Sequence, residues 1–257
     1  MSNPDVTFGD VTVVLDAHHV AEIEMHRPPA NYFDAALLAG VVDAVDWAAG
    51  AGGRAVVLCS EGRHFCAGLD FGATDKPEPG ALIAIYSSAR HLIDSPLPII
   101  AAVHGSAIGG GLGLAIAADF RVAGPSTRFA ANFARLGFHQ GFGISLTLPH
   151  VVGHQKALEL LTTGRRVEGP EALAIGLCDR LDGDPRMAAH TLAAEIAQSA
   201  PLAVRSIRRT LRGDIVHGFA AMVDHERSEQ LRLMESADFR EGIAASMARR
   251  PPVFRGE

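Results

Sequence analysis

Short apolar runs alternate with helical repeats of apolar residues over the first two-thirds of the chain. Runs rich in Val, Ile, Leu or Phe predict strands at residues 11–15, 20–25, 54–60, 99–103 and 120–123. Apolar side chains at helical spacing after Asp34 predict a helix, and a second helix is expected over about 80–93, before Ser95. This alternation predicts an α/β core in which most strands pair in parallel.

The carboxyl-terminal part of the chain has a different pattern. From about residue 187 the strand signal ends, and helical periodicity is found at residues 187–199, 201–211, 215–234 and 238–247. Pro201 and Asp238 are residue types that commonly open helices. We therefore expect a core at residues 1–190 and a helical region at residues 191–257.

Composition and charge indicate a globular protein with a sizeable core. The 257 residues are 48% apolar and 20% charged, with a formal net charge of −6. No acidic or basic tail suggests a nucleic-acid partner. Cys59, Cys66 and Cys178 are widely spaced, so they predict neither a disulfide framework nor a paired-cysteine metal site. Together with an amino terminus that lacks the segments of a signal peptide, this predicts a cytoplasmic protein.

One segment, residues 95–118, carries no Asp, Glu, Lys or Arg, and five of the 27 glycines fall between Gly105 and Gly113. By length it could cross a bilayer, which needs about 20 apolar residues. However, its prolines and the triplet 109–111 would expose broken backbone to lipid, where each unsatisfied amide costs several kcal/mol. We therefore expect a buried segment of the core and no membrane association.

Several common catalytic motifs are absent from the sequence. The glycine cluster does not complete a dinucleotide-binding GxGxxG pattern, because Leu114 and Ile116 stand where the third glycine would be. There is no Gly-Lys-Ser/Thr, no GxSxG and no HExxH, which removes the main sequence support for nucleotide triphosphate, serine-hydrolase and zinc-protease chemistry. The histidines are scattered, so no metal site is indicated.

Two glycine-containing turns follow predicted strands, at residues 64–70 and 104–111. Glycine lets the backbone bend tightly and approach a ligand closely. Since a helix is expected to start after the second turn, the Gly110 N–H group is well placed to face developing negative charge. For either turn alone, a purely structural role as a tight turn in a packed sheet is at least as good an explanation as a ligand-binding role.

Taken together, the two turns resemble a known family. The sequence Phe-Cys-Ala-Gly-Leu-Asp at 65–70, followed by Ala-Ala-Val-His-Gly-Ser-Ala-Ile-Gly-Gly-Gly at 101–111, is similar to the crotonase superfamily, the enoyl-CoA hydratase/isomerase family. The segment 136–143 resembles the family's Leu-Gly-x-x-Pro-Gly segment, with Gln140 in place of the usual proline. Further similar segments run the length of the chain, at 26–31, 161–166, 174–177 and 238–254.

The resemblance implies a spiral of ββα units whose terminal helices form a homotrimer, often a dimer of trimers. It implies a coenzyme A thioester as substrate and no permanently bound cofactor. The backbone amides of Leu69 and Gly110 would form an oxyanion hole for the thioester carbonyl. Coenzyme A and acyl contacts are expected from the following residues: Arg27, Ala30, Ala67, Leu69, Asp70, Phe71, Gly72, Gly110, Phe133, Arg249 and Arg250.

The sequence departs from the family at its acidic positions. Members that hydrate an enoyl-CoA hold and activate water with two glutamates, and alignment on the motifs puts Gly113 and Phe133 at those positions. A third acidic position, used by other members, falls on Gly141. Because an acid or base typically contributes about 10²–10⁴ in rate, ordinary hydration is not expected.

What replaces the missing acids stays open. His139 could act as a base at neutral pH, or it could be a surface or packing histidine. Arg205, Arg208, Arg209 and Arg212 share one helical face, which could meet coenzyme A phosphates or form a solvated or intersubunit face. The leading expectation is an acyl-CoA enzyme that stabilises a thioester enolate, as an isomerase, hydrolase or decarboxylase. The alternative is a catalytically silent acyl-CoA-binding subunit.

Overall fold

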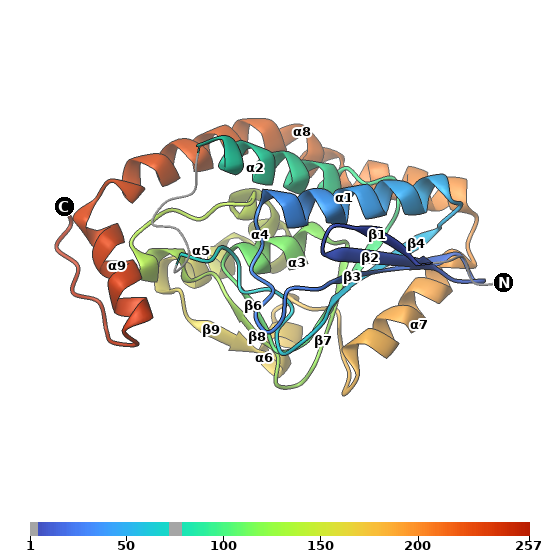
Figure 1. Cartoon of the computed structure of the whole chain (residues 1–257), viewed down its shortest axis with the longest axis horizontal. Coiled ribbons are helices and arrows are strands. Elements are labelled where there is room, and N and C mark those ends of the chain that lie inside the picture. The colour runs from blue at the N-terminus through green and yellow to red at the C-terminus, as the bar shows by residue number, and fades with distance from the viewer. Residues whose placement is uncertain (1–4, 72–78) are drawn as a thin grey trace.

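The computed structural model describes residues 5–71 and 79–257 of the chain (Figure 1). Its larger sheet has the strand order β1-β2-β3-β4-β5-β7-β10, in which the first three strands are antiparallel and the remaining pairs are parallel. These strands are β1 (Val6–Phe8), β2 (Val11–Leu15), β3 (Val20–Met25), β4 (Ala55–Ser60), β5 (Ile99–Val103), β7 (Phe120–Ala123) and β10 (Arg180–Leu181).

A smaller sheet holds the second glycine turn. It consists of β6 (Ser106–Ile108), β8 (Arg128–Ala130) and β9 (Arg166–Glu168), with β6 parallel and β9 antiparallel to β8. These strands have only three residues each, and their pairing joins segments that are distant in sequence. For this reason hydrophobic periodicity did not reveal them.

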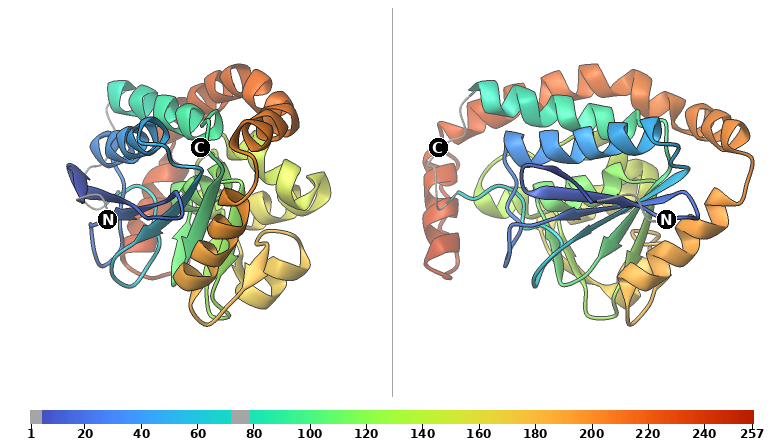
Figure 2. Two further views of the ribbon diagram at one scale, coloured as in Figure 1. Left: turned by 90° about the vertical axis from the view of Figure 1, so that its right-hand side faces the viewer. Right: turned by 45° about the vertical axis from the view of Figure 1, so that its right-hand side comes forward.

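Burial on both faces explains the apolar strands of the larger sheet. Every residue of β4 and β5 is buried, as expected for central parallel strands covered on both sides. Helix α7 (Pro185–Ala197) packs its Ala189, Leu192 and Ala193 against one face. The opposite face carries the main core together with α1 (Ala35–Gly50), α2 (Pro79–Ile93) and α3 (Gly110–Ala117), and Figure 2 shows α7 apart from α1 and α2.

The uncharged segment belongs to this core. It supplies β5, β6 and all of α3, and the residues of α3 after Gly110 are buried throughout. Within residues 5–71 and 79–257, no helix combines the length and the apolar character that crossing a bilayer requires. The expectation of a buried segment is therefore confirmed.

The remaining helices follow the smaller sheet and build the carboxyl-terminal region. They are η1 (Asn132–Leu136), α4 (Ile144–Val152), α5 (His154–Thr163), α6 (Gly169–Ala174), α8 (Pro201–Met234) and α9 (Ala237–Met247). Helix α8 packs along α2 and against α4, and α9 turns away at the far end of the molecule (Figure 1). The predicted α/β core with a helical carboxyl-terminal region is confirmed, while the expected boundary at residue 190 lies inside α7.

The prediction of two separate helices, at 201–211 and 215–234, is wrong, because the structure has one continuous helix there. The intervening Gly213 keeps a helical backbone, and a glycine inside a helix costs only about 1 kcal/mol relative to alanine. Packing against α2 and α4 outweighs that cost.

Candidate active site

Backbone hydrogen bonds join the two glycine turns. The Phe65 N–H donates to His104 O (3.0 Å), the Cys66 N–H to Ser106 O (3.1 Å), and the Ile108 N–H to Cys66 O (3.1 Å). The segment after β4 therefore runs alongside β6 as a short parallel bridge. Its next residues reach the start of α3, since a Cβ atom on Gly68 would lie 3.2 Å from the Gly110 nitrogen.

Two glycines of the second turn are required by geometry. Gly109 has φ 55° and ψ −120°, a conformation open to glycine but strained for other residues. A Cβ atom on Gly111 would lie 2.1 Å from the Cys66 carbonyl oxygen, which is closer than any two such atoms can approach. These constraints bring the first residue of α3 against the first turn.

The backbone amides of Leu69 and Gly110 are the candidate ligand-binding groups at the junction of the two turns. Gly110 is the first residue of α3, so its N–H has no acceptor within the helix. Across residues 5–71 and 79–257, neither the Leu69 nor the Gly110 N–H donates to an acceptor of the protein. Both residues line one cavity, where the positive end of the α3 dipole favours negative charge.

This cavity, of about 370 Å³, has largely apolar walls that are rich in aromatic rings. Five phenylalanines line it, and their rings form two groups. The Phe33 and Phe142 rings contact each other at a centroid distance of 5.4 Å, and the other three lie with Phe239 in a cluster with centroid distances of 5.3–5.8 Å. Its volume is within the range of small-molecule sites. The lining phenylalanines are Phe33, Phe71, Phe133, Phe138 and Phe142.

The structure brings six of the expected contact residues together in this cavity. They are Ala67, Leu69, Asp70, Phe71, Gly110 and Phe133. Gly72 lies outside the described residues. The side chains of Arg27, Ala30, His139, Arg249 and Arg250 are not part of the cavity wall among the residues that the structure describes.

Arg27 and Ala30 lie in a loop that is fastened beside the first turn. Buried Asn31, at φ 48°, donates from its amide to the carbonyl oxygens of Glu61 and His64, both at 2.7 Å. The Ala30 carbonyl accepts from the Ala67 N–H at 3.0 Å. The Arg27 guanidinium pairs with Asp10 (2.6 Å) and Asp34 (2.9 Å), so its charge is matched within the chain.

The side chain of His139 is held away from the cavity wall. Its Nδ1–H donates to the Gln140 carbonyl at 2.8 Å, and its ring packs edge-on against His225 at a centroid distance of 5.7 Å. These contacts are those of a packing histidine. Its assignment as a base stays a prediction.

The two terminal arginines take part in the fold of the tail. The Arg250 guanidinium binds Glu241 through two contacts of 2.6 and 2.7 Å. This ion pair, together with a hydrogen bond that the Val253 N–H donates to the Glu241 carboxylate, lowers the pKa of Glu241 to about 2. Arg249 has φ 51°. Whether either residue meets a coenzyme A phosphate stays a prediction.

Uncharged side chains occupy the space at the three positions where the family resemblance places an acid. A Cβ atom on Gly113 would lie 2.7–2.9 Å from carbon atoms of the Phe142 side chain. One on Gly141 would lie 2.4 Å from Gln230 Nε2 and 2.8 Å from the Tyr86 hydroxyl. Phe133 itself closes the third position as a buried wall of the cavity. None of these three positions carries a carboxylate, and whether they correspond to the family's acids stays a prediction.

Tyr86, Phe142 and Gln230 are among the cavity residues that were not predicted from the sequence as site residues. They lie on α2, in the loop before α4, and on α8, so only the tertiary fold brings them together. The one sequence hint for Phe142 is its position between Gly141 and Gly143. It takes φ 64°, which is unusual for a bulky residue.

A buried carboxylate holds this loop in place. The Glu226 side chain of α8 is fully buried and accepts from the Gly143 N–H (2.7 Å) and the Ser145 N–H (2.8 Å) at the start of α4. Burial raises the pKa of Glu226, and these hydrogen bonds oppose that shift. The carboxylate satisfies amides that α4 leaves free and so fixes the loop that carries Phe142.

The face of α8 that carries Arg205, Arg208, Arg209 and Arg212 is partly buried. Arg208 and Arg212 both pair with Asp119, at 2.9 and 3.0 Å, and both bind carbonyl groups of the core. These two arginines therefore fasten α8 to the strand end before β7. Arg209 stays exposed on the same helix.

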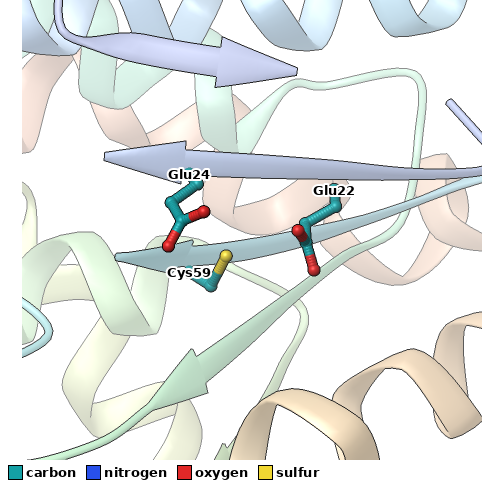
Figure 3. A group of neighbouring side chains, drawn as sticks. All are labelled: Glu22, Glu24 and Cys59. Carbon is teal, nitrogen blue, oxygen red and sulfur yellow. The ribbon is translucent and has the colours of Figure 1, made fainter. Parts of the chain in front are cut away.

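Glu22, Glu24 and Cys59 form a polar cluster on β3 and β4, with potential ligand atoms within 4.8 Å of one another (Figure 3). Arg186 of α7 binds both carboxylates, and His190 binds Glu22 at 2.5 Å. The hydrogen bonds from Arg186, which have the largest effect, and from His190 lower the pKa of Glu22 to about 2. Burial raises the pKa of the Cys59 thiol. The cluster is an ion-pair network that fastens α7 to the sheet.

Comparison with known proteins agrees with this geometry. A profile described as enoyl-CoA hydratase/isomerase matches residues 16–257. A probable enoyl-CoA hydratase of Bacillus subtilis (strain 168) is 34% identical over 247 residues, which cover 93% of this chain and 96% of the relative. An enoyl-CoA isomerase/hydratase of Mycosarcoma maydis is 32% identical over 213 residues, covering 79% of this chain and 77% of that protein.

Solved structures show the same fold. The crystal structure of an enoyl-CoA hydratase from Mycobacterium avium subsp. paratuberculosis K-10 superposes with a TM-score of 0.86 at 25% identity, covering 96% of this chain and 99% of that one. An enoyl-CoA hydratase/isomerase from Pseudoalteromonas atlantica T6c gives a TM-score of 0.83 at 29% identity, with coverage of 96% and 100%. The chain therefore belongs to the enoyl-CoA hydratase/isomerase family, within the crotonase superfamily.

Proposed function

We propose that this protein is an acyl-CoA enzyme that stabilises a thioester enolate with the backbone amides of Leu69 and Gly110. The observation that carries the proposal is that both amides lack a protein acceptor among the described residues and belong to one apolar cavity at the start of α3. Hydrogen bonds from such donors strengthen as the carbonyl oxygen gains charge. One donor of this kind is typically worth about 10²–10³ in rate.

The reaction we propose is not two-glutamate hydration. Gly113, Phe133 and Gly141 carry no carboxylate, and the space beside each glycine is occupied by Phe142 or by Tyr86 and Gln230. Isomerisation, hydrolysis and decarboxylation use the same polarised carbonyl and differ in where a proton is taken or given. An isomerase, hydrolase or decarboxylase therefore fits this site better than a hydratase.

Coenzyme A is proposed to lie along residues 67–72 and the loop that carries Arg27 and Ala30, with Arg249 and Arg250 toward its phosphates. The thioester is a substrate, and no permanently bound cofactor is invoked. A homotrimer, or a dimer of trimers, is proposed as the assembly. The exposed apolar residues Leu202, Ile207 and Leu211 of α8 supply a surface suited to it.

A turnover screen tests this function. The protein is incubated with a panel of enoyl-, β-oxoacyl- and aryl-CoA thioesters, and the products are followed by mass spectrometry. We expect conversion of at least one thioester class without addition of water across a double bond. Tight binding of these thioesters with no conversion of any would instead identify a silent acyl-CoA-binding subunit.

His139 offers a separate test within the same screen. If its imidazole is the base, His139→Ala should abolish turnover of the converted thioester while the dissociation constant for coenzyme A stays unchanged. His225→Ala is the matched control, because it removes the ring that packs against His139 and leaves the His139 imidazole in place. Unchanged turnover in His139→Ala would dismiss this residue as the base.

A further inference from the structure

Two polar side chains, Tyr86 and Gln230, interrupt the apolar wall of the cavity. The Tyr86 ring comes from α2 and the Gln230 amide from α8, and their side chains bond to each other at 3.2 Å beside Gly141. The two residues are only 4% and 5% exposed, yet both line the cavity. Polar groups so placed usually fix the orientation of a ligand.

The hydrogen-bonding capacity of this pair is only partly used. The Tyr86 hydroxyl shares its one proton between Gln230 Oε1 and the Glu226 carboxylate, and its oxygen accepts from the Phe142 N–H. Gln230 Nε2 donates one of its two hydrogens to the His139 carbonyl at 3.1 Å. What remains is one acceptor site on the Tyr86 oxygen and one N–H donor on Gln230.

The Tyr86 hydroxyl keeps its proton at neutral pH. Burial raises its pKa, and the neighbouring charge of Glu226 acts in the same direction. The pair is therefore a neutral donor and acceptor. An anionic group at the end of the acyl chain would be desolvated there beside the charge of Glu226, without a counterion.

The pair is separated from the oxyanion amides by two aromatic rings. Phe33 packs directly on Gly110, since a Cβ atom there would lie 2.5 Å from the Phe33 ring. The Phe33 ring contacts Phe142 at a centroid distance of 5.4 Å, and Phe142 adjoins Gly141, beside the pair. An acyl group held at the amides would reach the pair with its distal part.

We propose that Tyr86 and Gln230 bind a hydroxyl group on the distal part of the acyl chain, so that the protein selects hydroxyl-bearing acyl-CoA thioesters. The assignment rests on the proposed acyl-CoA function. A hydroxyl uses both vacant positions, because it donates to the Tyr86 oxygen and accepts from the Gln230 amide. A ketone uses only the amide, and a plain alkyl or phenyl group leaves both groups unpaired, which costs binding free energy.

Matched thioester pairs test the proposal. The dissociation constants of hexanoyl-CoA and ω-hydroxyhexanoyl-CoA, and of phenylpropanoyl-CoA and para-hydroxyphenylpropanoyl-CoA, are measured by calorimetry with the whole protein. We expect the hydroxyl compound of at least one pair to bind about tenfold more tightly. Tyr86→Phe and Gln230→Met should bring that ratio close to one while the deoxy compound still binds.

Tyr32→Phe is the matched control, because it removes the other tyrosine hydroxyl of the chain from the same cavity. It should leave the ratio unchanged. Binding of all four thioesters with ratios near one in the unaltered protein would overturn this proposal and leave the proposed function standing. A ratio that survives in Tyr86→Phe and Gln230→Met would also overturn it. Failure of all four to bind would overturn both.

Discussion

Crotonyl-CoA should be hydrated at least about 10⁴-fold more slowly by this protein than by a family member that carries both glutamates. Each general acid or base contributes about 10²–10⁴ in rate, and Gly113 and Phe133 supply neither. The proposed oxyanion amides would polarise the thioester carbonyl, but backbone N–H groups do not act as a base to activate water. The loss of absorbance of the conjugated thioester gives the rate, with the two-glutamate enzyme assayed in parallel.

Restoring the acids one at a time should not restore hydration. The Gly113→Glu side chain would collide with Phe142, which costs about 1–3 kcal/mol of folding free energy from overpacking, and more for the buried charge. Gly113→Ala is the control that separates crowding from charge. Hydration at the rate of the two-glutamate enzyme, in the natural chain or in Gly113→Glu alone, would contradict this interpretation of the site.

Removing the Gly110 N–H should lower turnover of the converted thioester by about 10²–10³. Gly110→Pro removes the donor, and proline is tolerated at the first position of a helix, where the N–H has no helical acceptor. The expected loss is in kcat, because the hydrogen bond strengthens as charge develops on the oxygen. Steady-state kinetics on the thioester found in the screen measure it.

Gly110→Ala is the control for this change. Both variants place a Cβ atom 2.5 Å from the Phe33 ring, so both force that ring to shift, but only the proline removes the donor. The ratio of kcat between the two variants therefore isolates the N–H group. Equal kcat values for Gly110→Pro and Gly110→Ala would exclude Gly110 from the oxyanion hole.

Local patterns in the sequence predict the central strands and the glycine turns. The strands β2 to β5 are long and apolar enough to be recognised, and the turn at Gly109 has a glycine that its backbone conformation requires. The short strands β6, β8, β9 and β10 were not predicted. They depend on pairing with distant segments, such as Ile108 with Ala130, which no local periodicity encodes.

The same distinction applies to the residues of the candidate site: some follow from local sequence, and others come together only through the tertiary fold. Leu69 and Gly110 could be proposed from the sequence because their amides are positioned by their own turns, whatever the side chain at 69. The structure places both residues in one cavity, and their role as an oxyanion hole stays a prediction. Tyr86 and Gln230 could not be predicted, because they come together only when α8 packs on α2. The glycine at position 113, where the family resemblance places an acid, was visible in the sequence, whereas the Phe142 side chain that occupies the space beside it was not.

The burial of Glu226 under the cavity loop couples ligand binding to the docking of the long carboxyl-terminal helix. Helix α8 fixes the start of α4 through Glu226 and supplies Gln230 to the cavity wall. A ligand in the cavity is therefore held partly by α8, and α8 can detach only if the hydrogen bonds of Glu226 to the Gly143 and Ser145 N–H groups break. By thermodynamic linkage, occupancy of the cavity must raise the free energy of opening α8. By the same linkage, a subunit that binds the outer side of α8 and holds it docked would raise the affinity for the ligand by the factor by which the ligand raises the affinity for that subunit.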